Sequence, residues 1–272
     1  MNGVNRALVE VSVGFHRAFL RNVGESFDRA VTSVRLSSGE RPALDAAKAR
    51  HQHGVYADAL ATLGLEVSRF PPDPRFPDGC FIEDTLVYAK GIGVVTRSAH
   101  PARRGEGAAL LEGYRGTGMR LVEMAPPATL DGGDVLRVGN VLLVGLTART
   151  NRAGVSALKA ALGPAGMEVR ALDMPEGILH LKCVVSSPAP DTVVLADETL
   201  SPDLFAPWRV LLIPAAERYA ANTVGVSGHV LVADGFPETR EVLASAGLVT
   251  HPIDTSEFRK ADGSLTCLSV IV

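Results

Sequence analysis

Two reactive side chains in this sequence could together attack an electrophilic carbon. They are Cys267, in DGSLTCLSVIV, and His180, in GILHLKCVV. A cysteine thiolate is a nucleophile, and it needs a base or a cation nearby to be populated at neutral pH. Histidine, with an unperturbed pKa of about 6.5, suits the role of general acid and base. Each residue alone has a structural alternative, because a cysteine beside an apolar strand commonly packs as a small hydrophobic side chain.

Carboxylates occur in two clusters that could bind a cation. The clusters lie in FPDGCFIEDTL and TLDGGDVL, and their acids are Asp78, Glu83, Asp84, Asp131 and Asp134. Carboxylates next to apolar strands need partners if they are buried, although an acidic loop residue such as Asp78 is also common on surfaces. Planar guanidinium, with five donors, is the cation that best uses paired carboxylates. The glycine pair of the second cluster resembles a phosphate loop, but the adjacent acids would repel phosphate.

Two arginines suggest how the other end of such a ligand is held. Arg103 lies in HPARRGE and Arg149 in LTARTN, each shortly after an expected strand. Either residue alone could belong to a solvated surface. Together they could bind a carboxylate, as one end of a zwitterionic amino acid. Acids for a guanidinium and arginines for a carboxylate describe an arginine-like ligand.

The elements that must bring these residues together recur along the chain. A polar residue opens an apolar strand at intervals of 42 to 50 residues, at Asp84, Asp134, His180, Asn222 and Cys267. In the first four units a turn and a second strand follow, as in DTLVYAKGIGVVTR. The fifth unit ends after one strand, so we expect residues 6–13 or 19–23 to supply its partner and close a ring.

Helical patterns lie between the units. Apolar residues have helical spacing in 42–64, which starts with proline and ends with glycine, and in the shorter segments 104–113, 151–162 and 237–247. The pattern predicts an α/β fold with about five strand–turn–strand–helix units around an axis, in one domain over residues 1–272. An ordinary α/β sheet is the alternative. Units that share an axis would bring their opening residues to one central cavity.

Composition excludes several classes of function. The net charge is -3, the pI is about 6.2 and aromatic residues make up 5%, which argues against binding to nucleic acid or anionic lipid. No apolar run reaches the roughly 20 residues of a membrane helix, and the N-terminus lacks a signal-peptide core. The three cysteines form neither a disulfide framework nor a zinc motif. We expect Cys183 to lie mid-strand in the core and Cys80, beside the acidic segment, to line the cavity. We therefore expect a cytoplasmic, reduced protein with a small-molecule substrate and no metal or organic cofactor.

Several motifs in order resemble a known family. PDGCFIEDTLVY, TLDGGDVLRVGNVLLVGLTARTN, LHLK and DGSLTCLSV are similar to the dimethylarginine dimethylaminohydrolase family, and the similarity runs from about Asp45 to the C-terminus. The resemblance implies a guanidino-group-modifying enzyme with a five-bladed pseudo-symmetric α/β propeller, the pentein fold. It also implies hydrolysis of Nω-methylated arginine to citrulline and dimethylamine or methylamine, through a covalent thiouronium on cysteine.

The resemblance also implies roles for individual residues. Matched by motif, Cys267 is the nucleophile, His180 the proton donor and Asp131 the acid that orients the site. The implied substrate contacts are Asp78, Glu83, Asp84, Arg103, Arg149 and the backbone of Ala261. The family's mobile lid falls near residues 25–38. The sequence departs from the family at Ala261, where a bulkier apolar residue is usual, and at Leu268, where some relatives have a second cysteine.

Two other functions stay open at this stage. An arginine deiminase-type enzyme would apply the same chemistry to arginine, although such enzymes usually carry an inserted helical domain for which 272 residues leave little room. Discrimination by methyl groups in an apolar pocket is worth only about 1–3 kcal/mol, so the sequence does not settle the preference among mono-, di- and unmethylated arginine. A non-catalytic ring, as in certain translation initiation factors, would not need the cysteine and histidine. Monomer and homodimer are equally compatible with the sequence.

Overall fold

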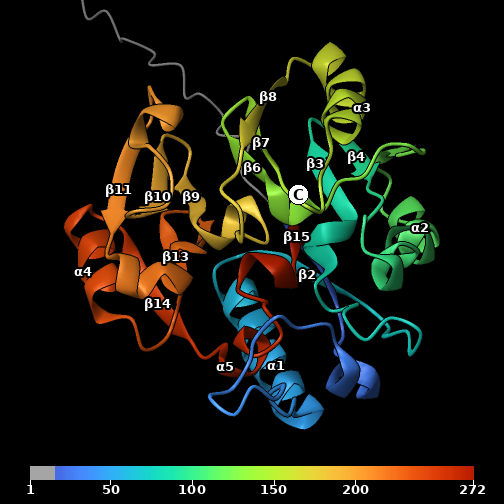
Figure 1. The fold of residues 1–272 in the computed structure, drawn as a ribbon. Helices are drawn as coiled ribbons and strands as arrows, with labels where there is room; N and C mark the ends of the chain where they lie inside the picture. The colour runs from blue at the N-terminus through green and yellow to red at the C-terminus, as the bar shows by residue number, and fades with distance from the viewer. Residues whose placement is uncertain (1–15) are drawn as a thin grey trace, which may run out of the picture.

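Residues 16–272 are described by the computed structural model, and their strands form five three-stranded sheets (Figure 1). In each sheet the middle strand pairs antiparallel with the inner strand and parallel with the outer strand. From inner to outer, the strands are β3 (Leu86–Ala89), β4 (Ile92–Val95) and β5 (Arg120–Glu123); β6 (Val135–Val138), β7 (Val141–Leu146) and β8 (Glu168–Asp173); β9 (Val185–Ala189), β10 (Thr192–Ala196) and β11 (Arg209–Ile213); β12 (Val224–Val226), β13 (His229–Ala233) and β14 (Val249–Ile253); and β15 (Val270–Ile271), β1 (Arg17–Arg21) and β2 (Glu66–Phe70).

Helices lie at the periphery of this arrangement (Figure 1). Four of them connect a middle strand to its parallel neighbour, since parallel strands need a crossover, and these are α1 (Ala46–Thr62), α2 (Glu106–Arg115), α3 (Arg152–Leu162) and α4 (Pro237–Ser245). In the third sheet the short 3-10 turn η7 (Pro202–Phe205) takes that place. The turns η1 (Glu25–Arg29), η3 (Pro101–Arg103) and η5 (Gly163–Ala165) lie in the same crossovers as α1, α2 and α3, and α5 (Ser256–Arg259) lies between β14 and β15. The four helices predicted from sequence are confirmed; three have shorter bounds, and α2 is shifted by two residues toward the C-terminus. Among residues 16–272, no helix has the length and hydropathy that a bilayer span requires.

The N-terminal part of the described chain completes the fifth sheet. Strand β1 pairs antiparallel with β15, where Phe19 lies opposite Val270, and parallel with β2. The second of the two expected closing segments is therefore confirmed, although the strand begins two residues earlier than expected. The other segment, residues 6–13, lies outside the described residues.

Local sequence explains why the repeated hairpins form. The β3–β4 connection is Lys90-Gly91 and the β12–β13 connection is Ser227-Gly228, and all four residues have positive φ. Two successive residues with positive φ form the primed turns whose twist matches that of paired strands. Helix α3 begins where the Asn151 side chain accepts a hydrogen bond from the Gly154 N–H at 2.8 Å, which satisfies a free donor of its first turn.

The hairpins leave one end of the axis lined by polar turns. Immediately before the inner strands lie the short 3-10 turns η2 (Ile82–Thr85), η4 (Gly132–Asp134), η6 (Leu181–Cys183), η8 (Ala215–Ala221) and η9 (Thr266–Leu268). Neighbouring turns contact one another from η9 through η2, η4 and η6 to η8. The hydrophobic clusters pack behind them, between sheets and helices. The expected convergence of the residues that open each unit is thus confirmed.

Candidate active site

Two cavities meet at the inner faces of these turns. The first cavity has a volume of about 30 Å³ and is lined by Val31, Asp78, Phe81, Asp84, Arg103, Arg149, Leu179, His180, Ala261, Asp262, Gly263 and Cys267. The side cavity has a volume of about 50 Å³ and is lined by Gly133, His180, Lys182, Cys183, Tyr219, Asn222, Asp262, Ser264 and Cys267. Seven of the nine sequence-predicted site residues line the first cavity, and the two reactive side chains line both.

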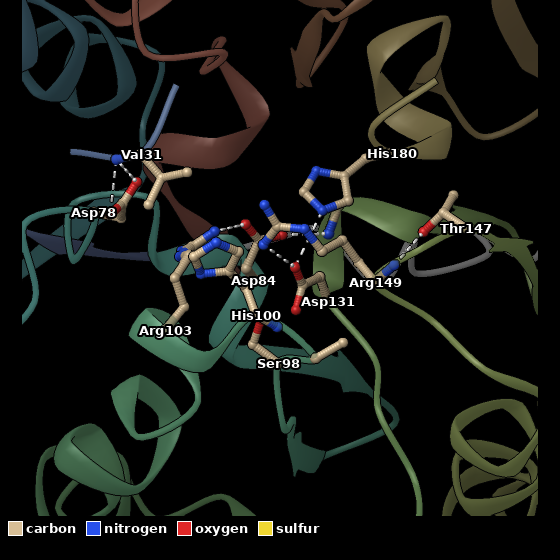
Figure 2. A network of polar contacts seen from close by, with 12 residues as sticks. Val31, Asp78, Asp84, Ser98, His100, Arg103, Asp131, Thr147, Arg149 and His180 are labelled. Atoms are coloured by element: carbon tan, nitrogen blue, oxygen red, sulfur yellow. Dashed lines mark hydrogen bonds and ion pairs between the residues drawn. The ribbon is translucent and has the colours of Figure 1, made fainter. Parts of the chain in front are cut away.

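His180 is held by buried carboxylates. It precedes η6 in an extended conformation, and its Nε2 lies 3.2 Å from the Oδ2 of Asp131, which is fully buried (Figure 2). Burial opposes protonation of the imidazole, but Asp84, Asp131 and the nearby Asp134 outweigh it and raise the pKa of His180 to about 9. The ring is therefore a cationic acid at neutral pH, with Nε2 donating to Asp131.

The two arginines differ in how they meet the cavity. Arg103 is buried and donates to Asp84 at 2.6 Å (Figure 2). It also donates to Glu106 at 2.7 Å, so its guanidinium is already paired. Arg149 is partly exposed, and its Nη1 lies 3.5 Å from Asp131. Of the pair predicted to bind a carboxylate, Arg149 is the more available, and Arg103 holds Asp84 in place.

Asp84 is the carboxylate most firmly kept ionised. Its Oδ1 accepts from the Gly133 N–H at 2.8 Å while its Oδ2 accepts from Arg103. Burial raises the pKa of Asp84, but the cations of His180 and Arg103 and these hydrogen bonds lower it below its ordinary value. Asp84, Asp131 and His180 have ligand atoms within 4.8 Å of one another, a spacing that could hold a metal ion. In this state His180 is protonated and has no lone pair to offer a metal ion, so the cation that these carboxylates meet is the imidazolium itself.

Glu83 lies apart from both cavities. Its carboxylate forms an ion pair with Lys182 and accepts from the Thr266 hydroxyl at 2.7 Å. It faces a larger cavity of about 170 Å³ along the axis, lined mainly by the inner strands. The structure therefore does not bring Glu83 to the first cavity with the other predicted substrate contacts.

A segment within the expected lid range crosses the first cavity. The Val31 N–H donates to both carboxylate oxygens of Asp78, at 3.1 and 3.2 Å (Figure 2). Ser33 Oγ donates to Asp262 Oδ1 at 2.9 Å, and Asp262 follows Ala261 in the opposite wall. Residues 31–33 thus tie the two sides of the cavity together. Burial raises the pKa of Asp78.

Cys267 lies in turn η9 and is half-buried between the two cavities. Burial, followed by the negative charges of Glu83 and Asp84, raises the pKa of its thiol well above the ordinary value. A cation bound over it would have the opposite effect. The expectation that Cys80 lines the cavity is wrong, because its side chain is buried in the hydrophobic core. The prediction that Cys183 lies mid-strand is wrong, because it ends the turn η6 before the strand begins. Its side chain packs against a hydrophobic cluster, as expected, but it also lines the side cavity.

Sequence reasoning missed several residues of this site. Glu106 had a signal, since it lies three positions after Arg103 at the start of a helix, where such pairs meet. Lys182 follows His180 by two residues, but nothing in the sequence assigns it to Glu83. His100, in the same motif as Arg103, lies beside the network, and burial and Arg149 lower its pKa (Figure 2).

Known proteins resemble this chain in sequence and in fold. No protein-family profile matches the chain. It is 34% identical over 236 residues to N(G),N(G)-dimethylarginine dimethylaminohydrolase of Pseudomonas aeruginosa, covering 86% of this chain and 92% of that one. It is 36% identical over 246 residues to the enzyme of that name from Streptomyces coelicolor, covering 88% and 93%. This chain belongs to the dimethylarginine dimethylaminohydrolase family.

Solved structures agree with that membership. A mutant of the Pseudomonas aeruginosa dimethylarginine dimethylaminohydrolase complexed with citrulline superposes with a TM-score of 0.89 at 31% identity, covering 95% of this chain and all of the other. The N-terminal domain of the cyanobacterial arginine dihydrolase ArgZ superposes with a TM-score of 0.84 at 18% identity, which shows a shared fold. The predicted five-bladed α/β propeller is confirmed for this member of the dimethylarginine dimethylaminohydrolase family.

Proposed function

We propose that this protein hydrolyses Nω-methylated L-arginine, as asymmetric dimethylarginine or monomethylarginine, to L-citrulline and dimethylamine or methylamine. The observation that carries the proposal is the meeting of Cys267 with the His180–Asp131 pair and Asp84 at one small cavity. Membership of a family whose relatives are named for this reaction supports it, as does the citrulline bound in one of them.

The charges of the first cavity match an arginine derivative. Asp84 is an ionised carboxylate at the inner end, where a guanidinium would lie beside Cys267. Asp78, at the lid, would accept from the substrate α-ammonium, and Arg149 would bind the α-carboxylate. Ala261 would contribute its backbone. Arg103 would act by holding Asp84, and Glu83 by placing a negative charge near the Cys267 thiol.

The reaction begins when substrate binding deprotonates the Cys267 thiol. In the empty site the raised pKa keeps Cys267 a thiol. The substrate guanidinium lowers that pKa, and the thiol loses its proton to solvent water as the thiolate forms. The thiolate bonds to the guanidinium carbon, and the bond from that carbon to the methylated nitrogen breaks. Protonated His180 gives its proton to the departing nitrogen, which leaves as a neutral amine.

The second half returns the enzyme to its starting state. The thiouronium on Cys267 is attacked by water, and His180 takes one proton of that water. The carbon–sulfur bond then breaks, Cys267 leaves as a thiol with the other proton, and citrulline remains. These steps use protein groups and water alone.

A product assay tests the proposal. Purified protein receives asymmetric dimethylarginine, monomethylarginine or arginine in separate reactions, and citrulline, the amine and ammonia are measured. We expect citrulline with dimethylamine or methylamine, and loss of turnover in Cys267→Ser and His180→Ala with folding retained. Cys80→Ala, which removes a core thiol, should keep turnover. Ammonia and citrulline from arginine alone would instead establish the deiminase-type reaction, and no citrulline from any substrate would refute the proposal.

A further inference from the structure

The side cavity is lined by neutral side chains together with charged ones that have partners of their own. Tyr219 donates to the Gly263 carbonyl at 2.9 Å, and its ring lies under the Arg259 guanidinium at 4.8 Å. Burial raises the pKa of Tyr219, and that of Cys183, to about 12. Both side chains are therefore neutral at physiological pH, and the Tyr219 ring is fixed.

The charged and amide groups that line the side cavity are already engaged. The Lys182 ammonium pairs with Glu83, and the Asp262 carboxylate accepts from Ser33. The Asn222 amide accepts from the Thr266 N–H at 2.8 Å and donates to the Thr266 hydroxyl at 3.0 Å. Besides the reacting groups His180 and Cys267, what remains toward the cavity is the Cys183 thiol, the Tyr219 ring, the Gly133 backbone and the Ser264 hydroxyl. Such a lining suits small alkyl groups better than a second charged group.

The orientation of His180 points the reacting nitrogen toward this cavity. Its Nε2 is bound to Asp131, which leaves Nδ1 to serve the departing amine. Nδ1 faces Gly133, because a Cβ built on Gly133 would lie 2.8 Å from that nitrogen. Gly133 lines the side cavity and does not line the first cavity. The same Cβ would lie 2.9 Å from Asp84 Oδ1, and Asp84 lines the first cavity. Nδ1 therefore lies where the two cavities meet, and a nitrogen that it protonates borders the side cavity.

We propose that the side cavity receives the alkylated ω-nitrogen of the substrate and that Cys183 determines which alkyl groups fit. This inference rests on the proposed function and names the part of the site that recognises the methyl groups. The substrate would enter through the first cavity, with its unsubstituted ω-nitrogen at Asp84. When the bond between the guanidinium carbon and the alkylated nitrogen breaks, the His180 proton makes a neutral amine, which the side cavity holds before release.

The size of the cavity agrees with this occupant. One water needs about 10–15 Å³ on this scale, so a cavity of about 50 Å³ holds roughly three to five non-hydrogen atoms. Dimethylamine has three. A longer alkyl chain would meet the Cys183 side chain and the Tyr219 ring, so shortening Cys183 should admit larger groups.

Two substitutions of Cys183 test the assignment. The measurement is kcat/KM for asymmetric dimethylarginine, monomethylarginine and Nω-propylarginine. In Cys183→Leu we expect the ratio of dimethyl to monomethyl activity to fall by about tenfold or more, since one methylene in an apolar pocket changes such ratios roughly 10- to 200-fold. In Cys183→Ala we expect the ratio of propyl to monomethyl activity to rise. Cys80→Ala, in the core, should leave both ratios unchanged.

The outcomes separate this inference from the proposed function. Equal losses on all three substrates, or unchanged ratios in both variants, would overturn the role of Cys183 and leave methylarginine hydrolysis standing. If Cys183→Leu does not fold, the ratio in Cys183→Ala decides alone. A wild-type protein that forms no citrulline from any methylated substrate would overturn both.

Discussion

Replacing Asp131 with asparagine should change the pH at which the enzyme loses its general acid. Asp131 is fully buried and its Oδ2 lies 3.2 Å from His180 Nε2. Asparagine keeps the shape and an acceptor oxygen but removes the negative charge. The protonated imidazole then loses one of the carboxylates that raise its pKa to about 9.

The size of the effect follows from that distance. Two unit charges 3.2 Å apart interact by roughly 5 kcal/mol at an effective dielectric constant of about 20. Relaxation of the site and the remaining charges of Asp84 and Asp134 make the effect on the His180 pKa smaller than this interaction energy. Half of the interaction energy corresponds to about two pKa units. The pKa of His180 would then fall from about 9 to near 7. At pH 8 the protonated fraction would drop about tenfold.

The assay is kcat/KM for asymmetric dimethylarginine between pH 6 and 10, with a direct titration of the His180 ring by NMR. Wild-type activity should decline as the pH rises through about 9, because the free enzyme loses the proton that His180 must donate. In Asp131→Asn the decline should move to near pH 7. Arg149→Gln is the matched control, since it removes the other partner of Asp131 and should raise KM without lowering the pH of the decline. A decline that stays near pH 9 in folded Asp131→Asn would refute the reasoning.

Three further predictions concern positioning, stability and the lid. Gly133→Ala should lower kcat by about 100-fold or more, because the new Cβ would lie 2.8 Å from His180 Nδ1 and 2.9 Å from Asp84 Oδ1 and would displace one of them. An unchanged kcat in the folded variant would show that these side chains need not stay in place. His53→Leu should resist acid better than the wild type, because burial lowers the pKa of His53 to about 4. Below about pH 6.5 the unfolded wild-type chain takes up a proton that the folded chain does not. The free energy of unfolding of the wild type therefore falls by about 3 kcal/mol between pH 6.5 and pH 4. Denaturant unfolding at pH 7 and pH 4 measures this, and equal losses in both proteins would contradict it. Asp262→Gly should raise KM on the order of tenfold with little change in kcat, because glycine accepts the positive φ of that residue while the hydrogen bonds to Ser33 are lost; an unchanged KM would show that residues 31–33 do not help to hold substrate.

The architecture could be predicted because it repeats. Strand, turn and strand recur with a polar residue at each start, and that period places the starts around one axis. The short fifth unit also predicted a closing strand, which β1 provides. The shift of Cys183 out of the strand was not predictable, because LKCVVSS reads as one apolar strand while its first residues form a 3-10 turn.

The pairing of charges could not be derived from spacing. Several carboxylates and several cations converge at the axis, and side-chain packing decides which of them meet. Arg103 pairs with Glu106 as well as Asp84, and Glu83 turns away to Lys182. The Asp78 contact to Val31 depends on a segment whose sequence resembles the family least. These contacts join distant parts of the chain, so local pattern carries no signal for them.

Trapping the covalent intermediate tests the central claim most directly. Wild-type protein is mixed with asymmetric dimethylarginine, stopped with acid during turnover, and digested for mass spectrometry. The account predicts a mass increase equal to the substrate less dimethylamine, on the peptide that contains Cys267, and the same adduct from monomethylarginine. Citrulline formation in the reaction with no adduct on Cys267, or an adduct on Cys80 or Cys183 instead, would contradict it.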